Sequence, residues 1–134
     1  LKGKRILVVE DEPLVAMDLE SQLLALGCIV VGPAPSVGRA MAHLDESEVD
    51  AALVDANLGG ERVGGLAAAL TRQGIPFAFA TGYERSALPR GFQDVPLLAK
   101  PFDERSIHAA IRDLLSRPRG SDADVVAMRA RKPI

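Results

Sequence analysis

Residues 5–11 read RILVVED, in which four consecutive apolar side chains end abruptly on two carboxylates. An apolar run of this length, without alternation of polar residues, is typical of a strand buried on both faces of a parallel sheet. Four more runs of this kind follow along the chain: CIVV (28–31), AALV (51–54), FAFA (77–80) and PLLA (96–99). The sequence therefore predicts five short buried strands.

Segments with helical spacing separate most of these runs. Their apolar stripes are Val15, Leu19, Leu23 and Leu26; Val37, Met41 and Leu44; Leu66, Ala67 and Leu70; and Ile107, Ala110, Ile111, Leu114 and Leu115. Ser36 and Asp103 are candidate N-caps, and Gly27 and Gly74 are candidate helix ends. Strands that alternate with helices predict an α/β fold, a doubly wound five-stranded parallel sheet with helices on both faces.

Two segments depart from this pattern. Residues 82–95, GYERSALPRGFQDV, should hold the fourth helix, but Pro89 and Gly91 interrupt it, so we predict a shortened helix around Glu84 to Leu88. The domain is predicted to cover residues 1–117. Residues 118–134 are predicted to form a linker or tail, either disordered or with a short helix.

Composition limits the class of protein. The 134 residues are 48% hydrophobic and 25% charged, with a net charge of −2, which argues against a basic face for direct DNA binding. The lone Cys28 allows no disulfide within the chain and fits a reducing compartment. No apolar stretch approaches the roughly 20 residues that span a bilayer, so we expect a cytoplasmic protein without membrane association.

Polar residues follow four of the five predicted strands. Glu10 and Asp11 follow the first, Asp55 the third, Thr81 the fourth and Lys100 the fifth. In the flavodoxin-like strand order 2-1-3-4-5, these four strands lie side by side and ligands bind beyond their carboxyl ends. The second run, followed by Gly-Pro, would form the edge strand. The order therefore brings all five side chains to one rim.

Each of these residues also has a purely structural explanation. Asp11 fits an N-cap of the first helix, with Pro13 in its first turn. Asp55 fits a turn residue, Thr81 a common strand residue and Lys100 an exposed surface charge. Because the same kind of chemistry ends four of five strands, the combination favours a shared site.

The chemistry expected at such a rim is phosphoryl transfer. Three carboxylates beside one lysine repel each other unless a cation intervenes, and Mg²⁺ with oxygen ligands fits that need. A carboxylate can attack phosphorus, and the transfer needs in-line positioning and positive charge around the phosphoryl oxygens. Lys100 and the metal would supply charge, while the Thr81 hydroxyl and the Ala56 amide would donate hydrogen bonds. Gly82 would leave space for the phosphodonor.

With these residues in order, residues 4–116 resemble a response-regulator receiver domain of two-component signalling. The resemblance rests on ILVVED (6–11), Asp55, Thr81-Gly82 and Lys100-Pro101-Phe102. It implies a phosphoacceptor regulator rather than an enzyme. A sensor histidine kinase would phosphorylate Asp55, and a downstream protein target would respond.

The same resemblance implies roles for individual residues. Asp11 and Asp55 would ligate Mg²⁺, Glu10 would act through metal-bound water, and the backbone carbonyl of Asn57 would complete the site. Lys100 would pair with the acyl phosphate, and its peptide bond to Pro101 would be cis.

The stretch PFAFATGY (76–83) further resembles the FATGUY subclass of receivers. Receivers usually carry Tyr or Phe three positions before the lysine, where this chain has Leu97. We therefore predict that phosphorylation orders or displaces residues 82–91, and that this loop, the fifth strand and the last helix form the readout surface.

Three other classes of protein compete with this interpretation. Phosphatases with an aspartyl nucleophile resemble D-x-D-x-T/V, whereas this chain has Asp55-Ala56-Asn57-Leu58, without room for a cap domain. A nucleotide-binding domain lacks its G-x-G-x-x-G or Walker A loop here. A receiver-like interaction module that is not phosphorylated is the alternative that stays open.

Overall fold

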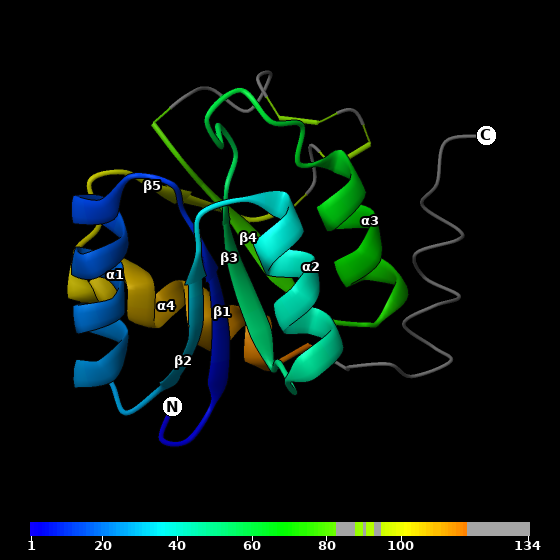
Figure 1. The fold of residues 1–134 in the computed structure, drawn as a ribbon. Coiled ribbons are helices and arrows are strands. Elements are labelled where there is room, and N and C mark those ends of the chain that lie inside the picture. Colours follow the sequence, from blue (N-terminus) through cyan, green and yellow to red (C-terminus); the bar gives the residue numbers. More distant parts are fainter. Residues whose placement is uncertain (83–87, 90, 93–94, 118–134) are drawn as a thin grey trace.

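Five parallel strands form the centre of the molecule in the order β2-β1-β3-β4-β5, as predicted (Figure 1). The computed structural model describes residues 1–82, 88–89, 91–92 and 95–117. Within them the strands are β1 (Arg5–Val9), β2 (Ile29–Ala34), β3 (Ala51–Asp55), β4 (Phe77–Thr81) and β5 (Leu97–Ala99). The helices are α1 (Pro13–Ala25), α2 (Val37–Glu46), α3 (Gly64–Arg72) and α4 (Glu104–Leu115).

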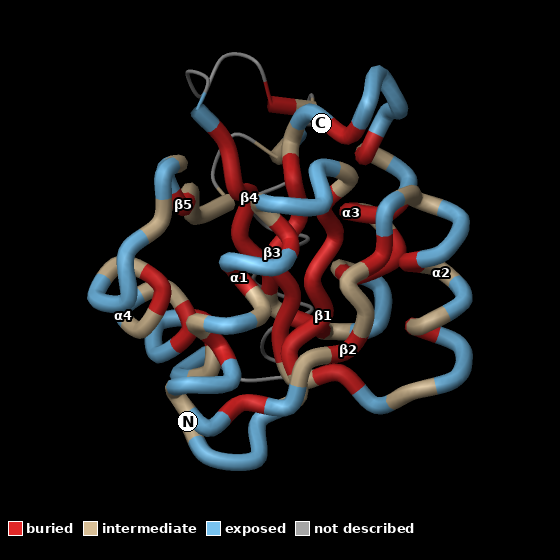
Figure 2. The backbone as a smooth tube through the Cα atoms, turned by 60° about the vertical axis from the view of Figure 1, so that its left-hand side comes forward, coloured by how far each residue is buried: buried red, intermediate tan, exposed pale blue. Residues whose placement is uncertain are grey.

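The helices cover the sheet in two pairs. Helices α1 and α4 lie on one face, and α2 and α3 lie on the other (Figure 1). Alternate side chains of each strand serve the two faces: Ile6 and Val8 of β1 join the core under α1 and α4, while Leu7 and Val9 join the core under α2 and α3. The central strands β1, β3 and β4 are accordingly buried almost throughout, whereas the edge strands β2 and β5 are partly exposed (Figure 2). Burial on both faces explains the continuous apolar runs of the central strands.

Two predicted caps are confirmed, and one alternative is not. The Ser36 side chain accepts a hydrogen bond from the Arg39 amide at 3.2 Å, and Asp103 forms a capping box with Ser106. The N-cap of α1 is Glu12, whose side chain makes no capping hydrogen bond. Asp11 therefore does not cap α1, and the structural explanation of this residue is wrong.

Strand β2 is longer than predicted, because it continues through Gly32 and Pro33 to Ala34. Its pairing with β1 shifts register between Leu7 and Val9, next to Gly32, whose φ is +95°. A Cβ atom at Gly32 would lie 2.7 Å from the Ala34 nitrogen and 3.0 Å from the Val8 oxygen. Only glycine therefore permits the irregularity at this point.

Two predictions fall on other parts of the chain. The shortened helix around Glu84 to Leu88 and the tail at 118–134 lie outside the described residues, except that Leu88 itself is described and buried. Within the described part, no helix has both the length and the apolar character needed to cross a membrane.

Candidate functional site

The carboxyl ends of the strands bring the predicted polar residues together. Asp55 pairs with Ala80 across β3 and β4, and Thr81 pairs with Ala99 across β4 and β5. The Lys100 amide donates to the Thr81 carbonyl at 3.2 Å. In the described part of the chain, Glu10, Asp55 and Thr81 are the buried polar or charged residues, at 3%, 3% and 4% exposure. The strand order thus concentrates buried polarity at one end of the sheet.

Three carboxylates meet at this rim. Glu10, Asp11 and Asp55 each offer one oxygen, and these oxygens lie within 4.8 Å of one another. The Asp55 Oδ1 atom accepts a hydrogen bond from the Asn57 amide at 3.0 Å, and Glu10 Oε2 accepts one from the Glu12 amide at 3.1 Å. Backbone amides from two different loops therefore orient two of the three acids.

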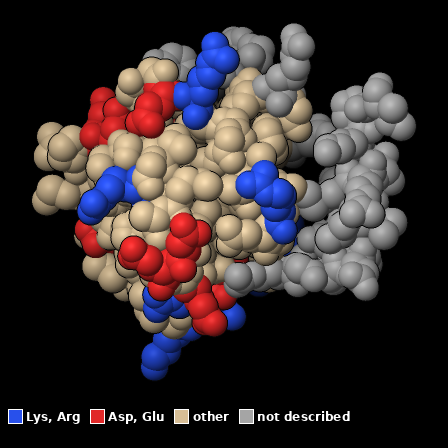
Figure 3. All heavy atoms as spheres, turned by 45° about the vertical axis from the view of Figure 1, so that its right-hand side comes forward, with Lys and Arg blue, Asp and Glu red and all other residues tan. Residues whose placement is uncertain are grey.

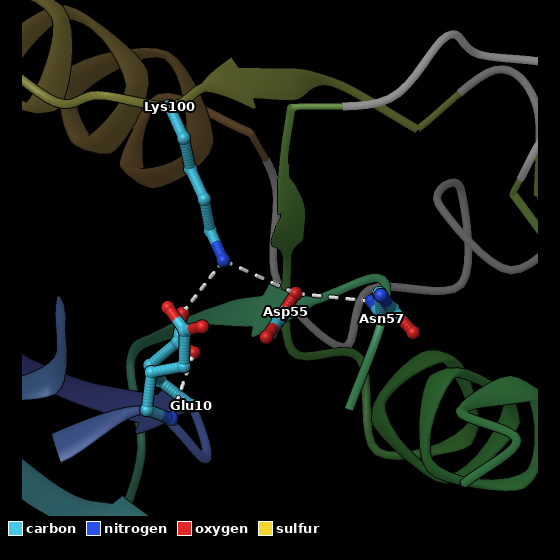
Figure 4. Close-up of polar contacts among 5 residues, drawn as sticks. Glu10, Asp55, Asn57 and Lys100 are labelled. Carbon is cyan, nitrogen blue, oxygen red and sulfur yellow. Dashed lines mark hydrogen bonds and ion pairs between the residues drawn. The ribbon is translucent and has the colours of Figure 1, made fainter. Parts of the chain in front are cut away.

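Lys100 bridges two of these acids (Figure 4). Its Nζ atom lies 3.0 Å from Glu10 Oε1 and 3.4 Å from Asp55 Oδ1. Burial alone would lower the pKa of Lys100, but the contact with Glu10 and the charge of Asp55 outweigh it and raise this pKa above its ordinary value. The lysine is accordingly held as a cation.

The burial of Glu10 affects its ionisation. Burial raises its pKa above the ordinary value, and the neighbouring Lys100 offsets only part of that effect. The buried Oε1 atom of Glu10 has the Lys100 Nζ atom as its charged neighbour at 3.0 Å. Three convergent carboxylates beside a single lysine fit a hard divalent cation such as Mg²⁺, which prefers oxygen ligands.

Strand β2 contributes to the site through its backbone, which the sequence did not indicate. The irregularity at Gly32 places the Ala34 carbonyl 2.9 Å from the Glu10 amide, which donates to it. This bond anchors the chain where β1 ends and the acidic pair begins. In the sequence, the Gly-Pro pair after the second run indicates only the edge strand. It also supports Glu10.

A cleft of about 360 Å³ opens at the rim. Its lining residues are Asp11, Glu12, Asp55, Asn57, Gly59, Gly82 and Lys100. A Cβ atom added at Gly82 would meet no atom within 4 Å, so the backbone there borders open space. The cleft gives a small molecule or a partner's side chain direct access to Asp55.

The amide of Ala56, which is predicted to donate to a phosphoryl oxygen, has a backbone partner in the structure. The amide of Ala56 donates to the Ala80 carbonyl at 3.1 Å, as an extension of the sheet, and is therefore engaged. The amide that contacts the Asp55 carboxylate belongs to Asn57 instead. The register of β3 against β4 holds the Ala56 amide in this position.

The structure also shows the position of Leu97 and the geometry of the Lys100–Pro101 peptide bond. Leu97, in place of the usual aromatic residue, is half-buried in β5 beside Phe79 and packs against the core under α2 and α3. The Lys100–Pro101 peptide bond is cis, as the resemblance implied. On the described part of the face in Figure 3, Lys and Arg side chains stand apart, separated by acidic and neutral groups.

These features define a receiver domain, a parallel α/β sheet whose carboxyl end carries three clustered acids, a threonine and a lysine, with a cleft lined by Asp11, Asp55 and Lys100. The response regulator receiver domain model matches residues 6–112, and the chain belongs to this family.

Several relatives are similar to this chain. The solution structure of SdrG from Sphingomonas melonis Fr1 has 42% identity and a TM-score of 0.75, covering 84% of this chain and 97% of that one. The phyllosphere-induced regulator PhyR of Methylorubrum extorquens is 35% identical over 117 residues. This alignment covers 82% of the chain but only 43% of that PhyR. The PhyR of Brucella abortus has 28% identity and a TM-score of 0.74, covering 96% of this chain and 52% of that one.

Proposed function

We propose that this chain is a phosphorylation-dependent signalling receiver in which Asp55 accepts the phosphoryl group. The observation that carries the proposal is the meeting of Glu10, Asp11 and Asp55 within 4.8 Å, with Lys100 against two of them. Structural charges are normally placed near opposite charges, whereas this arrangement gathers acids around a single cation. Membership of the receiver family and the cleft beside Asp55 support the same function.

The proposed reaction transfers phosphorus from nitrogen to oxygen. A carboxylate oxygen of Asp55 forms the new P–O bond while the P–N bond of a phosphohistidine breaks. The imidazole nitrogen keeps the electron pair of the broken bond and takes up a proton. Asp55 suits this role because it lines the cleft while the Asn57 amide fixes its carboxylate in one orientation.

Magnesium would be held by Glu10, Asp11 and Asp55, with the Asn57 carbonyl as the further ligand implied by the family. When bound, Mg²⁺ supplies positive charge that offsets the carboxylates and the charge of the phosphoryl group. The spacing of the three acids supports this placement.

Lys100 and Thr81 would stabilise the product. The Lys100 Nζ atom, now 3.4 Å from Asp55 Oδ1, would pair with a phosphoryl oxygen on the same carboxylate. The hydroxyl of Thr81, on the neighbouring strand, would donate to another phosphoryl oxygen. Gly82 borders the cleft without a side chain, which supports its role as the entrance for the phosphodonor.

The signal would leave the site through the segment after β4. We assign the chain to the FATGUY-like receivers, in which Leu97 replaces the aromatic switch, and residues 82–91 respond to phosphorylation together with β5 and α4. SdrG, 43% identical to this chain, has a solved BeF₃-activated conformation, which supports the use of beryllofluoride as the phosphoryl mimic. Amide exchange in residues 82–91 should change when this mimic is added; unchanged protection would contradict the relay.

The phosphodonor is proposed to be a protein, a sensor histidine kinase, rather than only a small phosphate ester. Helix α1 begins beside the acidic rim, and its side chains Leu14 and Met17 are 80% and 64% exposed. Exposed apolar residues next to a reactive cleft are typical of a surface that a protein partner covers. The downstream partner is proposed to be a protein as well; a PhyR of Bartonella quintana, 26% identical, is described as an anti-anti-sigma factor.

Mass spectrometry after incubation with acetyl phosphate and Mg²⁺ tests the central claim. We expect an adduct of about 80 Da on the wild type and none on Asp55→Ala. Asp50→Asn is the matched control, because Asp50 lies at the opposite end of β3 and should leave the adduct intact. No adduct on a folded wild type would instead favour the non-phosphorylated interaction module.

A further inference from the structure

Gly59 lies against the carboxylate of Asp11, although the two residues are far apart in the sequence. A Cβ atom added at Gly59 would lie 2.9 Å from Asp11 Oδ2 and 3.9 Å from Asp11 Cγ, with no other contact within 4 Å. Carbon and oxygen atoms do not approach so closely without displacement. Among the described residues, the group that an alanine at this position would disturb is therefore the Asp11 carboxylate.

The loop that carries Gly59 is held on both sides, so it cannot easily move to relieve such a contact. Leu58 is fully buried in the core. Its carbonyl accepts a hydrogen bond from the Glu61 amide at 2.8 Å, and the Glu61 side chain accepts one from the Val37 amide at 3.3 Å. The far end of a flexible side chain gives way more easily than an anchored loop, so Asp11 would move instead.

We propose that Gly59 is a positioning residue, whose missing side chain lets the Asp11 carboxylate stay with those of Glu10 and Asp55 where all three can hold a divalent cation. The inference rests on the proposed function, because it assigns Asp11 to the cation. Gly59 touches neither the reacting atoms nor the cation; it acts through Asp11. Outer residues of this kind typically change metal affinity 10- to 100-fold when they are altered.

Gly60 provides a matched control. Both glycines have positive φ, +55° for Gly59 and +84° for Gly60, so alanine is strained at both positions. A Cβ atom at Gly60 meets nothing within 4 Å, and Gly60 does not line the cleft. The two alanine variants therefore share the backbone strain and differ in the contact with Asp11.

The test is a Mg²⁺ titration followed by amide chemical shifts in proton–nitrogen NMR spectra, without a phosphodonor. Gly59→Ala should raise the Mg²⁺ dissociation constant about 10-fold or more, and Gly60→Ala should leave it within about 3-fold of the wild type. Equal affinities of the two variants would overturn the inference while leaving the proposed function intact. No saturable Mg²⁺ binding by the wild type would instead contradict the proposed function itself.

A double-mutant cycle shows whether the effect passes through Asp11. Asp11→Ala removes the atoms that the new Cβ would meet, so Gly59→Ala should add little further loss of Mg²⁺ affinity in that background. Full additivity of the two losses would contradict the inference. If Gly59→Ala alone does not fold, the double variant decides the question: folding restored by Asp11→Ala supports the steric contact, and continued misfolding contradicts it.

Discussion

The two ends of the sheet differ in how their charged side chains are partnered. At the amino end, the Arg5 amide donates to Asp50 Oδ2 at 2.8 Å, the Asp50 amide donates to the Arg5 carbonyl at 2.8 Å, and Arg5 Nε donates to the Glu48 carbonyl at 2.7 Å. At the carboxyl end, three carboxylates lie close together, and Lys100 contacts two of them, those of Glu10 and Asp55. We infer that the contacts at the amino end stabilise the fold, whereas the crowded acids at the carboxyl end lower its stability and serve the proposed function.

The strongest test of this contrast removes the cation at the carboxyl end. Lys100→Met should lower the free energy of unfolding by about 2 kcal/mol without Mg²⁺, because breaking a largely buried ion pair leaves charge uncompensated and partial exposure softens the effect. The rate of phosphorylation by acetyl phosphate should fall about 100-fold. Urea denaturation and mass spectrometry measure the two effects.

Lys4→Met is the control for that substitution, since Lys4 is exposed and lies at the amino end of the sheet. It should change neither quantity appreciably. Saturating Mg²⁺ should restore part of the stability of Lys100→Met, because a divalent ion among the three acids replaces the missing charge. A Lys100→Met protein as stable as the wild type without Mg²⁺ would break the comparison.

The same substitution at the two ends of one strand should have opposite signs. Asp55→Asn removes one of three crowded carboxylates and should raise the free energy of unfolding by about 1 kcal/mol while abolishing phosphorylation. Asp50→Asn replaces the charged acceptor of the Arg5 amide with a weaker neutral one and should lower it by about 1 kcal/mol. Urea midpoints at neutral pH without Mg²⁺ compare the two variants, and changes of the same sign would contradict the contrast.

The residues of the rim could be predicted because each of them directly follows an apolar run in the sequence. Glu10, Asp55, Thr81 and Lys100 each end a buried run, and parallel strands in a known order bring their carboxyl ends together. The bond from the Ala56 amide to the Ala80 carbonyl could not be predicted, because the register of β3 against β4 cannot be read from an apolar run.

Two glycines escaped prediction for a related reason. Gly32 permits a bond between the Ala34 carbonyl and the Glu10 amide, and Gly59 leaves room for the Asp11 carboxylate. In both cases the residue matters because it has no side chain where another segment of the chain lies close to it. Local patterns show such glycines only as turn residues, because the neighbour they accommodate becomes visible only after folding.

The smallest expected effect is the change in stability with pH in the absence of Mg²⁺. The pKa of Glu10 is raised above 4.5 by burial, so the folded state binds this proton more readily than the unfolded state. The protein should therefore gain stability as the pH falls from neutral through the folded pKa of Glu10 toward 4.5. The pKa of Asp103, lowered from 3.8 mainly by its hydrogen bond from the Ser106 amide, removes stability only below that value, outside this window.

Lys100 determines the alkaline limb of the curve of stability against pH, and Glu10 determines its acid limb. Its pKa lies above 10.5, so its stabilisation is complete below that pH and is lost as the pH rises through the folded pKa. Thermal midpoints at constant ionic strength in EDTA should show both limbs in the wild type. Glu10→Gln should flatten the acid limb, because the group that takes up the proton is gone. It should also weaken the alkaline limb, since Lys100 then keeps only Asp55 as an ionic partner. If the thermal midpoint rises equally in both proteins as the pH falls, other groups take up the proton. In that case Glu10 would not lower the stability of the carboxyl end at neutral pH.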